Sequence, residues 1–237
     1  MKKILTILLG TLMTGLLVSC EKVNGEGPVV TETRNRGSFS GVDLRVSANV
    51  YVTQDSTRSL EVRAQQNILD ILETYVADNK LVIKYRDGKR VRSNEEVTVT
   101  VHTPALNSLR VSGSGNITAP NAVKSTDMDM DISGSGNIHL QRLETGYLGA
   151  TISGSGNIRV PQGAATDQRL RISGSGNIDL EGVGAKTAAT TTSGSGDIRL
   201  QVADRLDVTI SGSGSVRYWG RPLINSHISG SGKVTPL

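Results

Sequence analysis

A repeated tetrapeptide, Ser-Gly-Ser-Gly, is the feature that most constrains the fold of this 237-residue chain. The residue after the tetrapeptide is Asn in four copies and Asp, Ser or Lys in the other three, and the next residue is always Ile or Val. The copies begin at Ser112, Ser133, Ser153, Ser173, Ser193, Ser211 and Ser229. A period of about 20 residues predicts supersecondary units that stack on one another, because one such unit cannot bury its own apolar face.

Apolar and polar residues alternate on both sides of each copy. In the second copy Met128, Met130 and Ile132 share one parity, and the aspartates between them share the other. This period of two predicts strands with one buried face. We therefore expect an all-β fold, a parallel β-helix or β-solenoid with coils of about 20 residues. A β-propeller is less favoured, because each unit is too short for a four-stranded blade.

The repeated turn supplies the predicted structural residues. Glycine accepts positive φ and allows close backbone approach at a sharp corner. The asparagines are expected to stack as a ladder whose amides bond from coil to coil, and the alternative is a polar stripe for sugar hydroxyls. The turn residues are Gly113, Gly115, Asn116, Gly134, Gly136, Asn137, Gly154, Gly156, Asn157, Gly174, Gly176, Asn177, Gly194, Gly196 and Asp197.

Residues 37–110 are predicted to form an irregular, β-rich N-terminal cap on the solenoid of residues 111–237. Residues 42–52 look like a degenerate copy of the repeat, with Ala48 in place of a glycine. A strand is expected at 59–63, a short helix at 67–74 and a hairpin of 80–85 with 97–101. Such a cap would cover one end of the stack, where an open coil would otherwise be an edge strand.

The start of the chain is typical of an exported lipoprotein. Lys2 and Lys3 precede an apolar run, residues 4–18, that is too short for a settled transmembrane helix. Leu17-Val18-Ser19-Cys20 resembles the bacterial lipobox, so residues 1–19 are predicted to be a signal peptide and Cys20, the single cysteine, the site of lipidation. An ordinary secretory peptide is the alternative. Residues 20–36 are predicted to be a lipid-anchored tether, flexible at least as far as Pro28.

Composition argues against several functions. Removing residues 1–19 lowers the formal charge from +4 to 4 − 2 = +2, and aromatic residues are few, so no nucleic-acid partner is expected. The sequence suggests no cofactor and no metal, since a calcium-binding β-roll has a nine-residue repeat. No catalytic residue is assigned. Asp127, Asp129 and Asp131 are the best acids available for a glycan-cleaving enzyme, although they read more simply as the solvent side of one strand.

A second outward row follows two positions after each Asn. If the coils stack in register, Arg159, Asp179 and Arg199 lie on adjacent coils with alternating sign, and a solvated face is the favoured interpretation. The row consists of Thr118, His139, Arg159, Asp179, Arg199 and Arg217.

From residue 37 onward the chain resembles the GIN domain family, described as an auto-transporter adhesin head and frequent in lipoproteins of the Bacteroidetes. The resemblance rests on the Gly-Ser-Gly-Asn-Ile turns and on five further segments. These are Phe39-Ser40-Gly41-Val42-Asp43-Leu44, Asn49-Val50-Tyr51-Val52, Leu60-Glu61-Val62, Asn67-Ile68-Leu69-Asp70 and Asn79-Lys80-Leu81-Val82-Ile83. The resemblance implies a β-helical fold and a cell-envelope location, and it carries over no catalytic or binding residue.

The resulting hypothesis is a non-enzymatic lipoprotein of the cell envelope, anchored through lipid on Cys20 in the outer membrane and facing either the surface or the periplasm. Its β-solenoid would serve as a structural or adhesive module that binds a glycan or an envelope protein. The alternatives are a β-helix enzyme that degrades polysaccharides and a periplasm-facing accessory subunit of an envelope complex.

Overall fold

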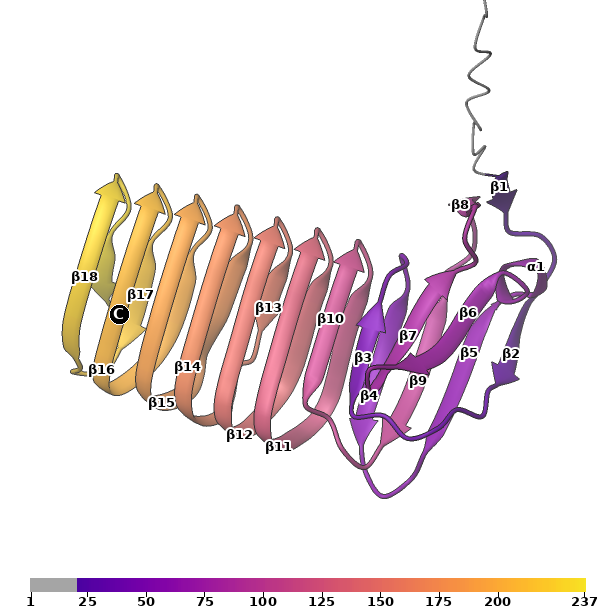
Figure 1. Cartoon of the computed structure of the whole chain (residues 1–237), viewed down its shortest axis with the longest axis horizontal. Helices are drawn as coiled ribbons and strands as arrows, with labels where there is room; N and C mark the ends of the chain where they lie inside the picture. Colours follow the sequence, from indigo (N-terminus) through magenta and orange to yellow (C-terminus); the bar gives the residue numbers. More distant parts are fainter. Residues whose placement is uncertain (1–20) are drawn as a thin grey trace, which may run out of the picture.

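The computed structural model describes residues 21–237 and forms an elongated, almost entirely β-structured molecule (Figure 1). The predicted signal peptide and Cys20 lie outside the described residues. The N-terminal elements are β1 (Glu21–Asn24), β2 (Val29–Thr33), β3 (Gly41–Leu44), β4 (Asn49–Gln54), β5 (Ser59–Gln65), α1 (Gln66–Leu69), β6 (Leu72–Ala77), β7 (Lys80–Tyr85), β8 (Lys89–Ser93) and β9 (Thr98–Thr103).

The C-terminal elements form a β-solenoid of about six turns, so the predicted fold class is confirmed. They are β10 (Ser108–Gly113), β11 (Asn116–Gly134), β12 (Asn137–Gly154), β13 (Asn157–Arg159), β14 (Gly163–Gly174), β15 (Asn177–Gly194), β16 (Ile198–Gly212), β17 (Val216–Trp219), β18 (Leu223–Gly230) and β19 (Val234–Pro236). Strands that lead into the glycine turns end along one edge of the rod, the upper edge in Figure 1. Several long strands bend back on themselves at the opposite edge, so a single strand such as β12 supplies most of one coil.

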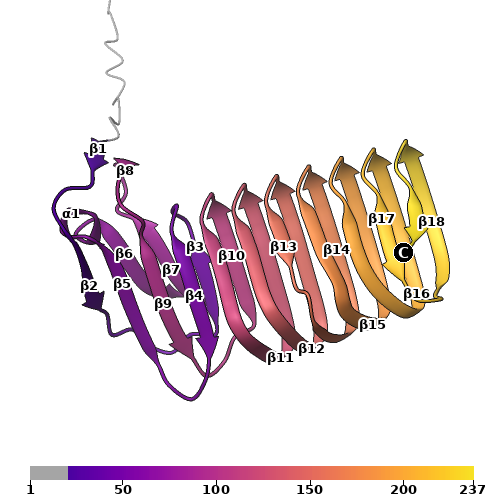
Figure 2. The same ribbon diagram turned by 180° about the vertical axis from the view of Figure 1, so that it is seen from behind.

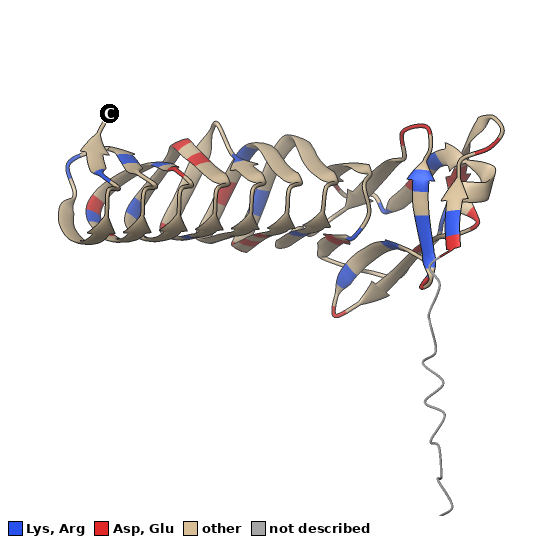
Figure 3. Cartoon of the chain, turned by 90° about the horizontal axis from the view of Figure 1, so that it is seen from above, with Lys and Arg blue, Asp and Glu red and all other residues tan. Residues whose placement is uncertain are grey.

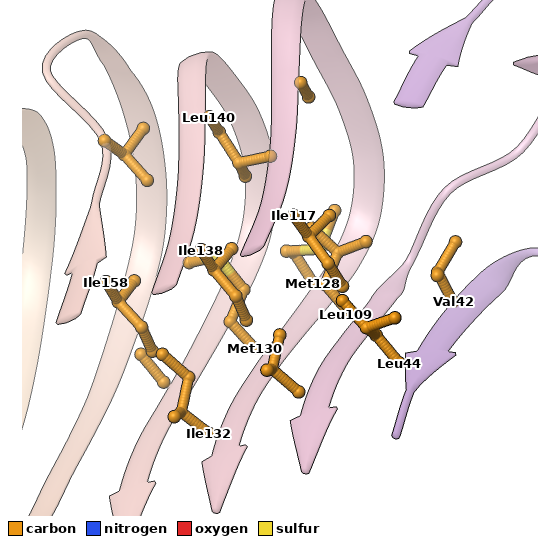
Figure 4. Close-up of a cluster of buried hydrophobic side chains, with 14 of the residues drawn as sticks. Val42, Leu44, Leu109, Ile117, Met128, Met130, Ile132, Ile138, Leu140 and Ile158 are labelled. Atoms are coloured by element: carbon orange, nitrogen blue, oxygen red, sulfur yellow. The ribbon is translucent and has the colours of Figure 1, made fainter. Parts of the chain in front are cut away.

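The coils stack in parallel with each repeat in register with the next. Ser133 and Gly134 of β11 lie over Ser153 and Gly154 of β12. These in turn lie over the equivalent residues of β14, Ser173 and Gly174. Inside the stack the apolar parity forms continuous ladders, and Figure 4 shows Leu109, Ile117, Met128, Met130, Ile132 and Ile138 packed together from successive coils. All six are at most 1% exposed. Burying such a side chain contributes roughly 1.5–3 kcal/mol, which is why stacking stabilises units that are too short to fold alone.

The two glycines of each turn are required for different reasons. The first adopts φ between 122° and 142°, a region that L side chains rarely enter. At the second, a Cβ would meet backbone: at Gly156 it would lie 2.0 Å from the carbonyl oxygen of Gly136 in the coil below. The first glycine's carbonyl also accepts hydrogen bonds from the next coil, as Gly134 does from the N–H groups of Ser155 and Gly156.

The N-terminal part continues the stack and then closes it. β3 and β4 pair in parallel with β10 and β11, so the degenerate copy around Ala48 forms a coil as expected. β7 and β9 lie beneath β3 and β4, again in parallel. β6 and β5 then pair with them antiparallel, and β2 pairs antiparallel with β5. The coils pair in parallel, whereas β2, β5 and β6 pair antiparallel. These three strands cover the N-terminal end of the stack.

Three local predictions are corrected by these pairings. The expected hairpin of 80–85 with 97–101 does not form, because β7 pairs with β6 and β3 while β9 pairs with β5 and β4. The expected helix at 67–74 is the single turn α1, and its second half belongs to β6.

The third correction concerns the tether. The part of it within the described chain is not a flexible linker. β1 pairs in parallel with β8, and β2 pairs with β5. The guanidinium of Arg34 is almost fully buried and donates hydrogen bonds to the carbonyls of Leu69 (3.0 Å) and Leu72 (2.6 Å). These contacts hold the segment to the cap.

Candidate binding face

A polar face runs along the solenoid beside the glycine turns. We call it the ladder face, and it consists of the turn residues Asn116, Asn137, Asn157, Asn177 and Asp197 with the outward residues Thr118, His139, Arg159, Asp179 and Arg199. Each turn residue lies over its equivalent in the next coil, and so does each outward residue. The face exists because the parity of the strand, fixed by the buried Ile after each turn, sends these side chains outward.

The asparagines form a continuous hydrogen-bonded row. The Nδ2 of Asn137 donates to the Oδ1 of Asn116 at 2.8 Å, Asn157 to Asn137 at 2.9 Å and Asn177 to Asn157 at 3.0 Å. The row begins in the degenerate coil, where Asn116 donates to Asn49 at 2.8 Å. At its other end Asp197, which has no amide to donate, receives Arg217 at 3.1 Å instead. The structure therefore brings the sequence-identified turn residues together as one row.

The row leaves hydrogen-bonding capacity for a ligand. A side-chain amide carries two N–H donors, and each rung uses one of them on its neighbour. The Nδ2 atoms of Asn157 and Asn177, which are both exposed, thus each retain an N–H that can bind a ligand. The Oδ1 atom of Asn137 is more fully used, because it accepts the backbone N–H of Asn157 as well as its amide, and the Oδ1 atom of Asn177 accepts the backbone N–H of Asp197.

A hollow lies where the charges of the ladder face are densest. Asn157, Arg159, Asn177, Asp179, Asp197 and Arg199 line it. Arg159 and Asp179 form a loose ion pair of 3.9 Å, with the Arg159 side chain 63% exposed. Within the described chain no acidic side chain forms an ion pair with Arg199, although Asp179 is its neighbour in register. The hollow therefore presents guanidinium, carboxylate and amide groups side by side.

Residues 38–222 match the family model described as "Putative auto-transporter adhesin, head GIN domain". The chain belongs to this family. Among curated proteins, none matches this chain.

Solved structures share the GIN-domain fold over nearly their whole length. A "putative adhesin" from Bacteroides fragilis is 25% identical and has a TM-score of 0.84, covering 91% of this chain and 100% of its own. A "putative lipid binding protein" from Parabacteroides distasonis (23%, TM-score 0.76) covers 92% of this chain and 100% of its own. A "putative adhesin" from Parabacteroides merdae (22%, TM-score 0.74) covers 91% of this chain and 99% of its own. The chain is accordingly an adhesin-like β-solenoid module, and these relatives are named as binding proteins rather than as enzymes.

The acids singled out as enzyme candidates lie elsewhere on this GIN domain. Asp127, Asp129 and Asp131 project from one strand, opposite Tyr147, Gly149 and Thr151 of the next coil. Partial desolvation, together with the neighbouring charges of Asp131 and Asp127, raises the pKa of Asp129. They form a row on a sheet surface, which suits a solvated strand better than two acids facing each other across a substrate.

The histidines are also dispersed. His102 donates a 2.7 Å hydrogen bond from Nδ1 to the Asp55 carboxylate in the N-terminal part, His139 lies between Thr118 and Arg159, and His227 lies in the last coil. In residues 21–237 no serine hydroxyl is hydrogen-bonded to any of them, and no group of three or more His, Cys, Asp or Glu side chains is arranged to hold a metal ion. None of the helices in that part of the chain has the length and apolarity needed to cross a membrane.

Sequence reasoning missed a second polar surface. Lys22, Arg90 and Arg92 project together from the small sheet of β1 and β8, beside a hollow that they line with Val91. A β1 strand can be read from the alternation of Lys22 and Asn24 with Val23, but nothing in the sequence indicates β8 as its partner. Elsewhere the charges are mixed in sign along the rod, as Figure 3 shows.

Proposed function

We propose that the protein is a lipoprotein of the cell envelope, anchored through Cys20, whose β-solenoid presents the ladder face as an adhesive surface for a glycan or an envelope protein. The observation that carries the proposal is the row of amides with free N–H donors beside Arg159, Asp179 and Arg199. Sugar hydroxyls both donate and accept hydrogen bonds, so a surface with amide, carboxylate and guanidinium groups at regular spacing suits them. The stiff stack supports the same proposal, because a preordered surface loses little entropy on binding.

A binding measurement on glycan arrays tests the ladder face. We expect the full chain to bind a subset of envelope or dietary glycans, and Arg159→Ala with Arg199→Ala to weaken that binding at least tenfold. Arg169→Ala with Arg171→Ala is the matched control, because both are exposed arginines of β14, away from the ladder face. Equal binding by both variants would refute the role of the ladder face.

Lipidation is tested separately by metabolic labelling with a palmitate analogue. The wild-type chain is expected to incorporate label and the Cys20→Ala chain to incorporate none. Label that persists in the variant would contradict the anchor. Protease digestion of intact cells then distinguishes a surface-facing from a periplasm-facing module.

The rival function is a polysaccharide-degrading enzyme that uses the row of Asp127, Asp129 and Asp131. Incubation of the purified chain with the glycans it binds, followed by product analysis, decides between the two. Turnover that is lost in Asp129→Asn would replace the adhesive proposal. Co-purification with a fixed set of envelope proteins, without glycan binding, would instead favour an accessory subunit.

A further inference from the structure

The small sheet of β1 and β8 has two chemically different faces. Val23 and Val91, which lie opposite each other, pack partly buried against the core. The opposite face carries Lys22, Arg90 and Arg92, all exposed. We call these three residues the basic ribbon, and in Figure 1 and Figure 2 its strands stand together at the edge of the N-terminal part.

The basic ribbon contains a repulsion that the fold does not relieve. Lys22 of β1 lies directly opposite Arg90 of β8, and like charges at opposed positions destabilise a strand pair. The nearby acid, Glu21, forms its ion pair with Lys89. Within residues 21–237, none of the three ribbon cations forms an ion pair with a carboxylate. An external anion between them would remove the repulsion.

The position of the ribbon in the chain indicates where that anion comes from. Lys22 follows Cys20 by two residues, so its Cα lies at most about 7 Å along the chain from that of Cys20. This is less than one Debye length at physiological ionic strength, about 8 Å. Because β1 is held in the fold by its hydrogen bonds to β8, a lipid on Cys20 would bring the whole ribbon to the headgroups. Glu21 N–H donates to the Gly88 carbonyl at 2.9 Å, and Gly25 N–H to the Ser93 carbonyl at 2.7 Å, at the two ends of the pair.

From these observations we propose that the basic ribbon binds the phosphates of anionic lipid headgroups in the membrane that holds the anchor. Guanidinium groups bind phosphate oxygens through paired N–H donors, and Lys22 adds a third positive charge opposite Arg90. The ribbon thereby fixes how the rod stands on the membrane. This inference rests on the proposed lipidation of Cys20, and it is independent of what the ladder face binds.

The test uses the mature lipoprotein, reconstituted into vesicles of phosphatidylcholine alone or with phosphatidylglycerol. Arginines are modified with phenylglyoxal, and the rate at each site is read by mass spectrometry. We expect Arg90 and Arg92 to react at least about fivefold more slowly on the anionic vesicles, the factor that corresponds to one residue's attraction to such a surface. Arg171, on the solenoid, should react equally on both.

A charge reversal separates membrane binding from folding. Lys22→Glu would place a carboxylate opposite Arg90, so the pair of strands should be at least as stable as before, while protection on anionic vesicles should be lost. Arg171→Glu makes the same change in net charge away from the ribbon and should leave protection intact.

The remaining outcomes overturn specific claims. Equal labelling on both vesicle types, in protein whose mass includes the lipid, would refute the ribbon and leave the anchor standing. A Cys20 without lipid would refute the anchor itself. Equal protection by glycerol phosphate in solution, at the same phosphate concentration, would show that the site takes a free phosphate compound and not a membrane.

Discussion

At the scale of single residues, the second glycine of each turn is constrained by the coil beneath it. A Cβ on Gly156 would lie 2.0 Å from the Gly136 carbonyl oxygen and 2.8 Å from a methyl group of Ile132. Since backbone cannot move aside without shifting a coil, we expect Gly156→Ala to lower the free energy of unfolding by at least about 2 kcal/mol. Urea unfolding monitored by circular dichroism measures it.

Gly37 provides the control for that substitution. It has ordinary φ, and a Cβ there would have nothing within 4 Å. Gly37→Ala should be neutral or slightly stabilising, because it restricts the unfolded chain. Equal losses at both positions would mean that the turns do not stack closely.

A second residue-scale prediction concerns a hydroxyl inside the core. Thr192 is fully buried, in register between Ile172 and Ile210, and within the described part of the chain its Oγ1 has no hydrogen-bond partner. Thr192→Val keeps the shape and removes the desolvated hydroxyl, so we expect a gain of about 1 kcal/mol. The half-exposed Thr191 is the control, where the same change should stay within about 0.5 kcal/mol. A loss of stability in Thr192→Val would indicate that the hydroxyl is satisfied by water.

Acid sensitivity is predicted at Asp55. Hydrogen bonds from the Thr57 hydroxyl, then from His102 and the Thr57 backbone, lower the pKa of its carboxyl from 3.8 to about 2. The folded protein thus binds this proton less tightly than the unfolded chain, so the stabilising effect is complete above about pH 4 and is lost as pH falls through 2. In Thr57→Val the pKa should rise toward 3.8, and in Thr57→Ser it should stay near 2. A titration of the carboxyl carbon by NMR measures both, and an unchanged pKa in Thr57→Val would assign the shift to His102 and the residue 57 backbone N–H instead of the Thr57 hydroxyl.

At the scale of elements, the position of a strand in the stack decides what its side chains contribute. Ile210 of β16 and Ile228 of β18 lie in register, but Ile210 is 0% exposed and Ile228 is 41% exposed, because β18 pairs only with β16. We expect Ile210→Ala to cost about 2–5 kcal/mol and Ile228→Ala less than about 1 kcal/mol. Denaturant unfolding of the two variants compares them directly. Equal costs would mean that the last coil is covered in solution.

The repeat made most of the solenoid predictable, and the cap much less so. Each coil has the same residues at the same spacing, so pairing Ile138 with Ile158 needs no information beyond the sequence itself. Strand β7 was predicted at its observed residues, yet its partner was wrong, because alternation within Lys80–Tyr85 indicates a strand and not which edge it joins.

The candidate binding surfaces also differ in how far the sequence predicts them. The row of asparagines followed from the period, whereas the basic ribbon depends on the pairing of Lys22 with Arg90 across 68 residues of chain. The segment that contains Lys22 was also predicted to be flexible, because its glycines and its proline are typical of a linker. Nothing in its sequence indicates that Arg34 is buried. A buried guanidinium that binds two main-chain carbonyls leaves no periodic signal.

At the scale of the whole molecule, the rod has one covered end and one open end. β5 and β6 close the N-terminal end with antiparallel pairings. At the other end, within the described chain, β18 and β19 each pair on one side only, and Leu223, Ile224 and Ile228 are exposed. In a linear stack each coil is stabilised by its contacts with the coils on either side. A coil at an open end has only one neighbour, so it unfolds locally before the middle does.

Amide hydrogen exchange should therefore be fastest in β18 and β19, slowest in β12 and β14, and still slow in β7 and β9 beneath the cap. Arg34→Ala removes the guanidinium that satisfies the Leu69 and Leu72 carbonyls and pairs with Glu32 at 3.1 Å. A loss of about 2 kcal/mol in the cap should speed exchange in β5, β7 and β9 about thirtyfold, while β16 keeps its wild-type rate. Arg63→Ala serves as the control, because Arg63 is an exposed arginine of β5 whose side chain makes no hydrogen bond or ion pair within residues 21–237. Uniform acceleration along the rod would show instead that cap and solenoid unfold as one cooperative unit.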